Sequence, residues 1–240
     1  MYQIKVSNIT VDVVRKDIKN MHLAVYPPTG RVRIAAPLSV NEDAIRLFAI
    51  SKLGWIKRSQ RNFEKQERET PREFKERESH YFQGTRYLLR IKETTAAGYV
   101  ELRNKTYMDL YVKEGMSTDY MRNVLNEWYR EQLKLSIPEI IERWEKKMDV
   151  TVSSWQVRQM KTKWGSCNIE KRIIRLNLEL AKNPIHCLEY IVVHEMVHLL
   201  ERLHNDRFIA LMDHYLPNWR QLRNELNRIE VGFAQWREGV

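Results

Sequence analysis

Apolar and polar residues alternate along the N-terminal part of the chain, which is the pattern of half-buried β-strands. The alternation is clear in residues 9–13 and returns in residues 32–34 after a proline-containing turn, so residues 1–36 are predicted to form hairpins. Residues 82–91 and 99–112 show the same pattern. The N-terminal part is therefore predicted to be a strand-rich lobe.

Apolar residues recur at helical spacing in three further places. The first helix is predicted to begin after the capping residue Asn41, and a much longer helix after Ser117. Pro138 lies inside the long helix and is expected to kink or split it, because proline removes a backbone hydrogen bond. A third helix is predicted to open at Asn183-Pro184, where a capping residue precedes a proline at the first helical position.

Two short strands are predicted between the long helix and the third helix. The first covers residues 152–161, and residues 173–178 are predicted to be its hairpin partner. The charged segment 57–78 mixes both signs and is predicted to be a solvated helix or a linker. No internal repeat is evident. Together the elements predict an α+β fold with a strand-rich lobe containing one helix over residues 1–115, and a domain with a small antiparallel sheet over residues 116–240.

The composition of the 240 residues excludes several classes of protein. Hydrophobic residues make up 43% and charged residues 30%, which rules out a disordered chain, a collagen-like chain and a membrane-embedded bundle. The N-terminal segment lacks the pattern of a secretory signal, and two cysteines exclude a disulfide framework, so a cytoplasmic location is expected. The net charge of +10 favours either good solubility or attraction to nucleic acid, and no membrane partner is expected.

One segment of the third helix, His194-Glu195-Met196-Val197-His198, has the residue types and spacing of a metal site. Four residues along a helix turn the chain by about 400°, so His194 and His198 project from one face about 6 Å apart along the axis. Two imidazoles at that separation can hold one ion of tetrahedral preference, and zinc (Zn2+) fits best. Glu195 is then placed to take a proton from water as a general base.

The spacing leaves the third ligand open. His204 follows closely in the sequence, but on one continuous helix it would lie about 9 Å beyond the second histidine, too far to share the ion. The helix is therefore predicted to end between residues 199 and 203, so that the chain turns back. His214, Glu225 and Glu230 are the alternative third ligands, since each could arrive from a following helix.

A site of this kind predicts a reaction class. Three protein ligands and a water molecule are the arrangement of a catalytic zinc site, whereas four protein ligands close a structural one. With a glutamate beside the ion, the expected reaction is hydrolysis of an amide bond in a peptide or protein substrate. The alternative is a non-catalytic protein that keeps zinc for structure.

A second motif, Lys161-Thr162-Lys163-Trp164-Gly165-Ser166-Cys167, lies at the end of the first of the two predicted short strands. Trp164, Gly165 and Ser166 are candidate substrate-binding residues, because a strand edge here could pair with an extended peptide and form one wall of an active cleft. The alternative is a tight turn packed around its aromatic residue. Cys167 is a further candidate metal ligand, but the histidines suffice without it.

These motifs resemble those of the YgjP-like metallopeptidases, which are relatives of the SprT-like zinc proteases. The resemblance is carried by Lys163–Cys167, Leu176–Leu180, Val193–His198 and His204–Phe208. It implies a zincin-like peptidase domain in which His194, His198 and His204 hold zinc and Glu195 is the general base. It therefore favours His204 over the other candidate third ligands.

Two positions depart from the patterns of related enzymes. Asn205 follows the third histidine where the family pattern suggests a serine, which leaves the ligands untouched. Glu201 stands where metzincins have a glycine, which argues against membership of that group. The relation to SprT-like proteases, together with the net charge of +10, also suggests a second function, a protease recruited to DNA.

Overall fold

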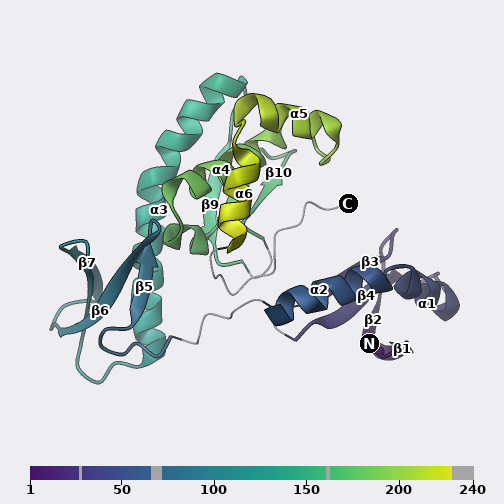
Figure 1. The fold of residues 1–240 in the computed structure, drawn as a ribbon, viewed down its shortest axis with the longest axis horizontal. Coiled ribbons are helices and arrows are strands. Elements are labelled where there is room, and N and C mark those ends of the chain that lie inside the picture. The colour runs from purple at the N-terminus through teal and green to yellow at the C-terminus, as the bar shows by residue number, and fades with distance from the viewer. Residues whose placement is uncertain (27–28, 66–71, 161–162, 229–240) are drawn as a thin grey trace. The chain divides into compact units, whose positions relative to one another are not determined.

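The computed structural model describes the whole chain except residues 27–28, 66–71, 161–162 and 229–240. Its internal contacts divide the chain into two compact units, Met1–Arg68 and Glu69–Val231. Figure 1 shows the helices and strands of each unit. Among the described residues, no helix is both long enough and apolar enough to cross a membrane.

The first unit is a four-stranded sheet with two helices packed on one face. Its elements are β1 (Tyr2–Val6), β2 (Ile9–Lys16), β3 (His22–Tyr26), β4 (Arg31–Pro37), α1 (Glu42–Ser51) and α2 (Leu53–Lys65). The strand order is β1-β2-β4-β3, with β2 and β4 parallel and the outer pairs antiparallel. Alternate residues of β2 and β4 are buried with Ile45, Ala49 and Ile56 of the helices. The predicted strands and the Asn41 cap are confirmed, since Asn41 Oδ1 accepts the backbone N–H of Ala44 at 2.8 Å.

The second unit begins with a sheet that repeats this topology. Its strands are β5 (Ser79–Phe82), β6 (Thr85–Glu93), β7 (Tyr99–Arg103) and β8 (Tyr107–Val112). Their order is β5-β6-β8-β7, and again the central pair is parallel while the outer pairs are antiparallel. The two sheets share strand order and direction, although the sequence shows no corresponding repeat.

The division between the units differs from the predicted boundary at residue 115. One face of the β5–β8 sheet packs on α3 (Thr118–Met148), where Leu89 and Met108 share a buried cluster with Leu125. Tyr129 of α3 also donates its hydroxyl to the Tyr81 carbonyl at 2.7 Å. The sheet therefore belongs to the second unit. The first unit has two helices where one was predicted, because the helix is interrupted at Lys52, the C-cap of α1, and α2 then continues into the charged segment beyond Ile56.

Helix α3 runs unbroken through Pro138, where a kink or split was expected. Ser117 caps it as predicted, with its Oγ accepting the backbone N–H of Tyr120 at 3.2 Å. Ile137 and Ile140 are buried on either side of the proline. An internal proline costs a helix about 3 kcal/mol, and tertiary packing of these side chains offsets that cost.

The third sheet differs from the prediction in its pairing. Its strands are β9 (Ser154–Arg158), β10 (Gly165–Asn168) and β11 (Ile173–Asn177), in the order β10-β11-β9. β10 is antiparallel to β11, but β9 is parallel to it. The predicted hairpin between residues 152–161 and 173–178 is therefore wrong, and the sheet is mixed rather than antiparallel. A parallel pair needs a crossover, and the chain between β9 and β11 is long enough to provide one and to contribute β10.

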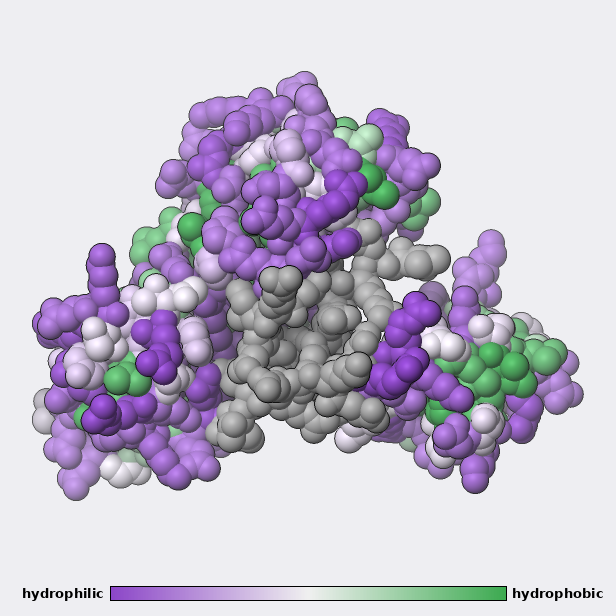
Figure 2. Space-filling view, in the orientation of Figure 1, coloured by the Kyte–Doolittle hydropathy of each residue, from purple (hydrophilic) through white to green (hydrophobic). Residues whose placement is uncertain are grey.

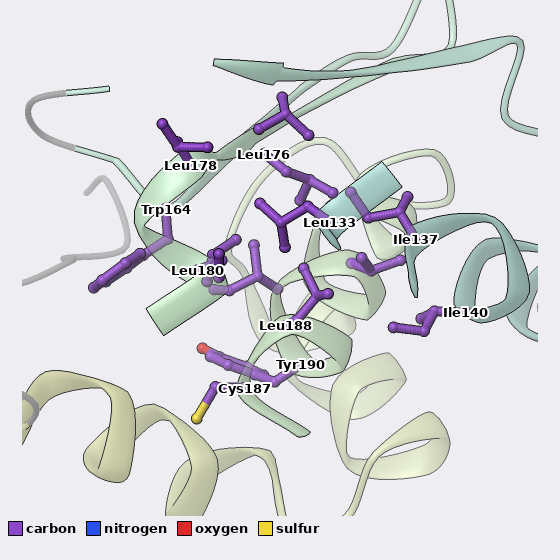
Figure 3. Close-up of a cluster of buried hydrophobic side chains, with 14 of the residues drawn as sticks. Leu133, Ile137, Ile140, Trp164, Leu176, Leu178, Leu180, Cys187, Leu188 and Tyr190 are labelled. Atoms are coloured by element: carbon purple, nitrogen blue, oxygen red, sulfur yellow. The ribbon is translucent and has the colours of Figure 1, made fainter. Parts of the chain in front are cut away.

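Helix α4 (Ile185–Val197) lies in the centre of the core of the second unit. All of its residues from Tyr190 to Val197 are buried. Around it lie α3, η1 (Leu178–Lys182), α5 (Asp206–Tyr215) and α6 (Trp219–Arg228). Figure 3 shows Leu133 and Ile137 of α3 meeting Leu188 of α4 in this core. In the view of Figure 2, by contrast, hydrophilic residues cover most of the visible surface of the second unit.

The packing of α3 generates a paired test of stability. Ile137→Ala removes a fully buried side chain and is expected to lower the free energy of unfolding by about 2–5 kcal/mol. Leu135→Ala, two residues away, removes a side chain that is 75% exposed and is expected to change it by less than about 0.5 kcal/mol. Urea unfolding of the full chain measures both values, and equal losses would contradict the described orientation of α3.

Candidate metal centre

The C-terminal end of α4 brings the first two predicted metal ligands together. His194 lies in the last turn, and His198 directly follows the final helical residue, Val197. The ring centroids of the two histidines are 5.1 Å apart, as expected for side chains one helical turn apart. Glu195 between them is 2% exposed and His194 is fully buried, so both the carboxylate and the first imidazole lie inside the core.

The chain turns sharply after α4, which is what His204 requires. The helix ends slightly before the predicted range of 199–203, and the backbone N–H groups of Leu199 and Leu200 donate back to the carbonyls of Met196 and Val197 at 2.9 Å. No residue between 198 and 205 has a positive φ, so the turn needs no glycine. Short-range hydrogen bonds of this kind tighten the end of a helix and reverse the chain.

A helix cap on the far side of the turn fixes the position of His204. Asn205 is the cap of α5, and its Oδ1 accepts the backbone N–H of Phe208 at 3.0 Å. Asparagine and serine are both strong capping residues, so the departure from the family pattern at this position keeps the same local structure. His204 is thereby held directly before the first turn of α5.

The three histidines converge. Nε2 of His204 lies 3.0 Å from Nε2 of His194, and the candidate ligand atoms of all three residues lie within 4.8 Å of one another. Two nitrogens bound to one tetrahedral zinc at about 2.0–2.1 Å would lie about 3.3 Å apart. The histidine positions therefore fit a zinc ion with little rearrangement.

A hydrogen bond and burial set the protonation state of these imidazoles. Nδ1 of His198 donates to the carbonyl oxygen of Glu201 at 3.1 Å, which leaves Nε2 as the unprotonated nitrogen of the neutral ring. Burial holds the pKa of His194 well below its ordinary value, and the neighbouring histidines lower it further. Burial also lowers the pKa of His198 and of His204. Neutral imidazole is the form that binds a metal.

Phe208 is a site residue that the sequence reasoning did not assign. Its ring is fully buried, and its centroid lies 4.9, 4.8 and 4.6 Å from those of His194, His198 and His204. The ring thus packs against all three imidazoles and limits their rotation. A signal was present, because Phe208 ends the segment His204–Phe208 that carries the family resemblance, and it stands in the first turn after the Asn205 cap.

Gly165 of β10 makes the closest approach to Glu195. A Cβ atom at this glycine would lie 2.6 Å from Oε1 of Glu195 and 2.9 Å from its Cγ. Any larger residue would have to displace the carboxylate. Burial raises the pKa of the Glu195 carboxyl to about 8, with Lys163 opposing the shift, and a cation held by the histidines would oppose it further.

The other residues of the second motif have different surroundings. Trp164 is 5% exposed and belongs to the core, as Figure 3 shows, so its side chain fits the packed-turn alternative rather than an open wall. Ser166 is half-buried on β10. Burial raises the pKa of the Cys167 thiol to about 12, and this cysteine does not join the histidine cluster.

The alternative third ligands lie elsewhere. His214 is exposed on α5, and Glu225 accepts a hydrogen bond from His186 at 2.9 Å. With Cys187 these last two form a second cluster of metal-binding residue types, separate from the three histidines. Glu230 lies outside the described residues.

The sequence comparison assigns the family. The family description "YgjP-like, metallopeptidase domain" matches residues 19–229, nearly the whole chain. The chain therefore belongs to the YgjP-like family and carries a metallopeptidase domain, as the sequence motifs predicted. A search of curated protein sequences gave no match.

Two solved structures have a weak similarity to part of the chain. The metallopeptidase zymogen abylysin of Pyrococcus abyssi is 15% identical, with a TM-score of 0.36 over 38% of this chain and 90% of its own. The metallopeptidase zymogen jannalysin of Methanocaldococcus jannaschii is 21% identical, with a TM-score of 0.34 over 38% of this chain and 92% of its own. These scores are low, so the family assignment rests on the sequence match.

The contact between Gly165 and Glu195 generates a testable prediction. Gly165→Ala is expected to lower peptide hydrolysis by about tenfold or more, because displacing a reacting group by about 1 Å has effects of that size. Metal content is expected to stay unchanged. Steady-state kinetics and elemental analysis measure the two properties, and unchanged hydrolysis in the Gly165→Ala variant would contradict the contact.

Proposed function

We propose that this protein is a zinc-dependent peptidase of the zincin type, in which His194, His198 and His204 hold the ion and Glu195 is the general base. The observation that carries the proposal is the convergence of three neutral imidazoles within 4.8 Å beside a buried carboxylate. Imidazole nitrogen is a preferred ligand of zinc, and the donor set has the size and charge of a catalytic site.

The metal and the glutamate have separate tasks in this proposal. A bound zinc ion would supply Lewis acidity, which polarises a substrate carbonyl and lowers the pKa of water toward neutrality. Glu195 accepts a proton from the water whose oxygen attacks the scissile carbonyl carbon. It then delivers that proton to the departing amine nitrogen as the C–N bond breaks. Burial excludes bulk water from the carboxylate and strengthens its interaction with the reacting groups.

A peptide substrate fits the edge of the third sheet. β10 pairs on one side with β11 and stands at the end of the strand order, so no strand among the described residues pairs with its other edge, and we propose that an extended peptide pairs there. Because the Trp164 side chain is buried, we propose that the contact is made by the backbone of Gly165–Asn168 rather than by the indole. This edge begins at the glycine that touches Glu195, which would bring a paired peptide close to the base.

The number of ligands favours catalysis over a structural role. Within the described part of the chain, the cluster that contains His194 has three members, all histidines. A structural zinc site takes four protein ligands, whereas three leave a position for water or substrate.

Replacing the base tests the proposed chemistry. Glu195→Gln keeps the size of the side chain but cannot accept a proton, so hydrolysis of a peptide substrate should fall by about a hundredfold or more. Zinc content should be unchanged, because the residue is not a ligand. Elemental analysis and a proteolysis assay with and without a chelator measure the two properties. Unchanged activity in a zinc-replete variant would refute the role of Glu195.

Replacing the third histidine tests the proposed ligand set. His204→Ala is expected to weaken zinc binding by about tenfold or more, since one of three protein ligands is lost. His214→Ala is the matched control, because it removes an exposed histidine of α5 and should leave the affinity unchanged. Competition with a chromophoric chelator gives both affinities. Equal affinities for the two variants would exclude His204 as a ligand.

A further inference from the structure

The positive charge of the protein is concentrated in the first unit. Residues 1–68 contain thirteen lysines and arginines against six acidic residues, a net charge of +7 out of +10 for the whole chain. This unit contains none of the residues proposed above for peptide hydrolysis. A charge excess of this size on a small unit attracts polyanions.

The sheet of this unit has one covered face and one open face. Ile45, Ala49 and Ile56 of the helices cover the inner face. The residues that alternate with the buried ones form the open face, and most are exposed or half-buried. They are Gln3, Lys5, Thr10, Asp12, Val14, Lys16, His22, Ala24, Tyr26, Arg31, Arg33 and Ala35. This open face carries four lysines and arginines and one carboxylate.

That carboxylate is already neutralised. Asp12 is 3% exposed, accepts a hydrogen bond from Gln3 at 2.8 Å and forms an ion pair with Arg31. These two contacts hold the pKa of Asp12 below its usual value, so the residue stays ionised and compensated. Lys5, Lys16 and Arg33 thus leave the open face with an excess of positive charge.

Two adjoining hollows lie at the end of the sheet where β2 and β4 begin, and both include residues of this face. One has a volume of about 450 Å³ and is lined by Gln3, Thr10 and Asp12 of the open face, by the buried Ile9 and Val32, and by Gln60 of α2. The second has a volume of about 310 Å³ and is lined by Tyr26, Thr29, Arg31 and Arg33. They share Thr29 and Arg31, so they form one depression across β2, β4 and β3. Tyr26, which is 40% exposed, stands opposite Arg31 at its margin.

On the corresponding face of the β5–β8 sheet, the charged and aromatic side chains contact one another. There Arg90 binds Asp109 through two hydrogen bonds of 2.6 and 2.8 Å and also covers the ring of Tyr107. Tyr99 and Tyr111 stack on each other at 4.3 Å. The two sheets share one topology, but in the second sheet the arginine and the rings contact one another, whereas the first presents cations beside a hollow.

We propose that the open face of the first unit binds single-stranded nucleic acid, with Tyr26 stacking on a base and Lys5, Lys16 and Arg33 contacting phosphates. The two outer strands have five residues each, so the part of the face that all four strands share measures about 17 by 14 Å. A face of that size accommodates two or three unstacked bases, and aromatic and basic residues on an open sheet are the means by which such bases are bound. A duplex offers no exposed base to the ring. This inference does not rest on the peptidase function.

Fluorescence anisotropy with a labelled 20-nucleotide oligothymidylate tests the proposal on the full-length chain carrying Glu195→Gln. For three phosphate contacts, the affinity should fall by about 20-fold between 50 and 200 mM salt. The variant Lys5→Gln/Lys16→Gln/Arg33→Gln should bind at least about tenfold more weakly at 50 mM salt and lose most of the salt dependence. Tyr26→Leu should weaken binding about fivefold or more with the salt dependence retained.

The matched control is Lys52→Gln/Lys57→Gln/Arg58→Gln, which removes the same charge from exposed positions on α2 and on the turn before it. It should change the affinity by less than about threefold. Equal weakening by the two triple variants would show attraction to net charge alone and overturn the proposal. So would absence of binding at 50 mM salt, tighter binding of a duplex, or equal competition by polyglutamate. Thermal unfolding of each variant verifies that the unit is folded.

Discussion

Burial of a carboxylate and an imidazole in the middle of an apolar helix is the constraint on which the second unit depends. Glu195 and His194 are 2% and 0% exposed, between valines and isoleucine that are buried as well. Removing an isolated charge from water costs several kcal/mol, so such a helix is stable only if the carboxylate is protonated or a cation lies beside it. Burial raises the pKa of Glu195 to about 8 and lowers the pKa of His194, so both groups favour their neutral forms when no cation lies beside them. A divalent cation reconciles the two groups, because it needs neutral imidazoles and favours the ionised carboxylate.

The elements around α4 each restrain one part of this cluster. β10 approaches through a glycine, so the Glu195 carboxylate has room for its oxygens and little room to move. The turn after Val197 and the Asn205 cap return the chain at the position of His204. Phe208 then packs against the three imidazole rings from the first turn of α5. The site is thus held by packed side chains from two helices and a strand, as a preorganised site requires.

Local patterns predicted the caps of the helices and the spacing of the candidate ligands, whereas contacts distant in sequence were not predictable. The spacing of His194 and His198 follows from helical geometry alone, and the caps at Asn41 and Ser117 are local as well. The parallel pairing of β9 with β11 depends on the path of the chain between them, and alternation carries no information on strand direction. The Gly165–Glu195 contact, the rings around Phe208 and the place of β5–β8 beside α3 depend on tertiary packing in the same way. Pro138 shows the converse case, because a strong local signal is outweighed by buried neighbours.

A crystal structure of the zinc-loaded protein, with anomalous differences recorded at the zinc absorption edge, tests the three-histidine site. One strong peak is expected, bound by Nε2 of His194, His198 and His204 at about 2.0–2.1 Å, with the remaining position open to solvent and Glu195 beside it but not bound. A peak at the separate cluster of His186, Cys187 and Glu225, or a fourth protein ligand on the ion, would contradict it.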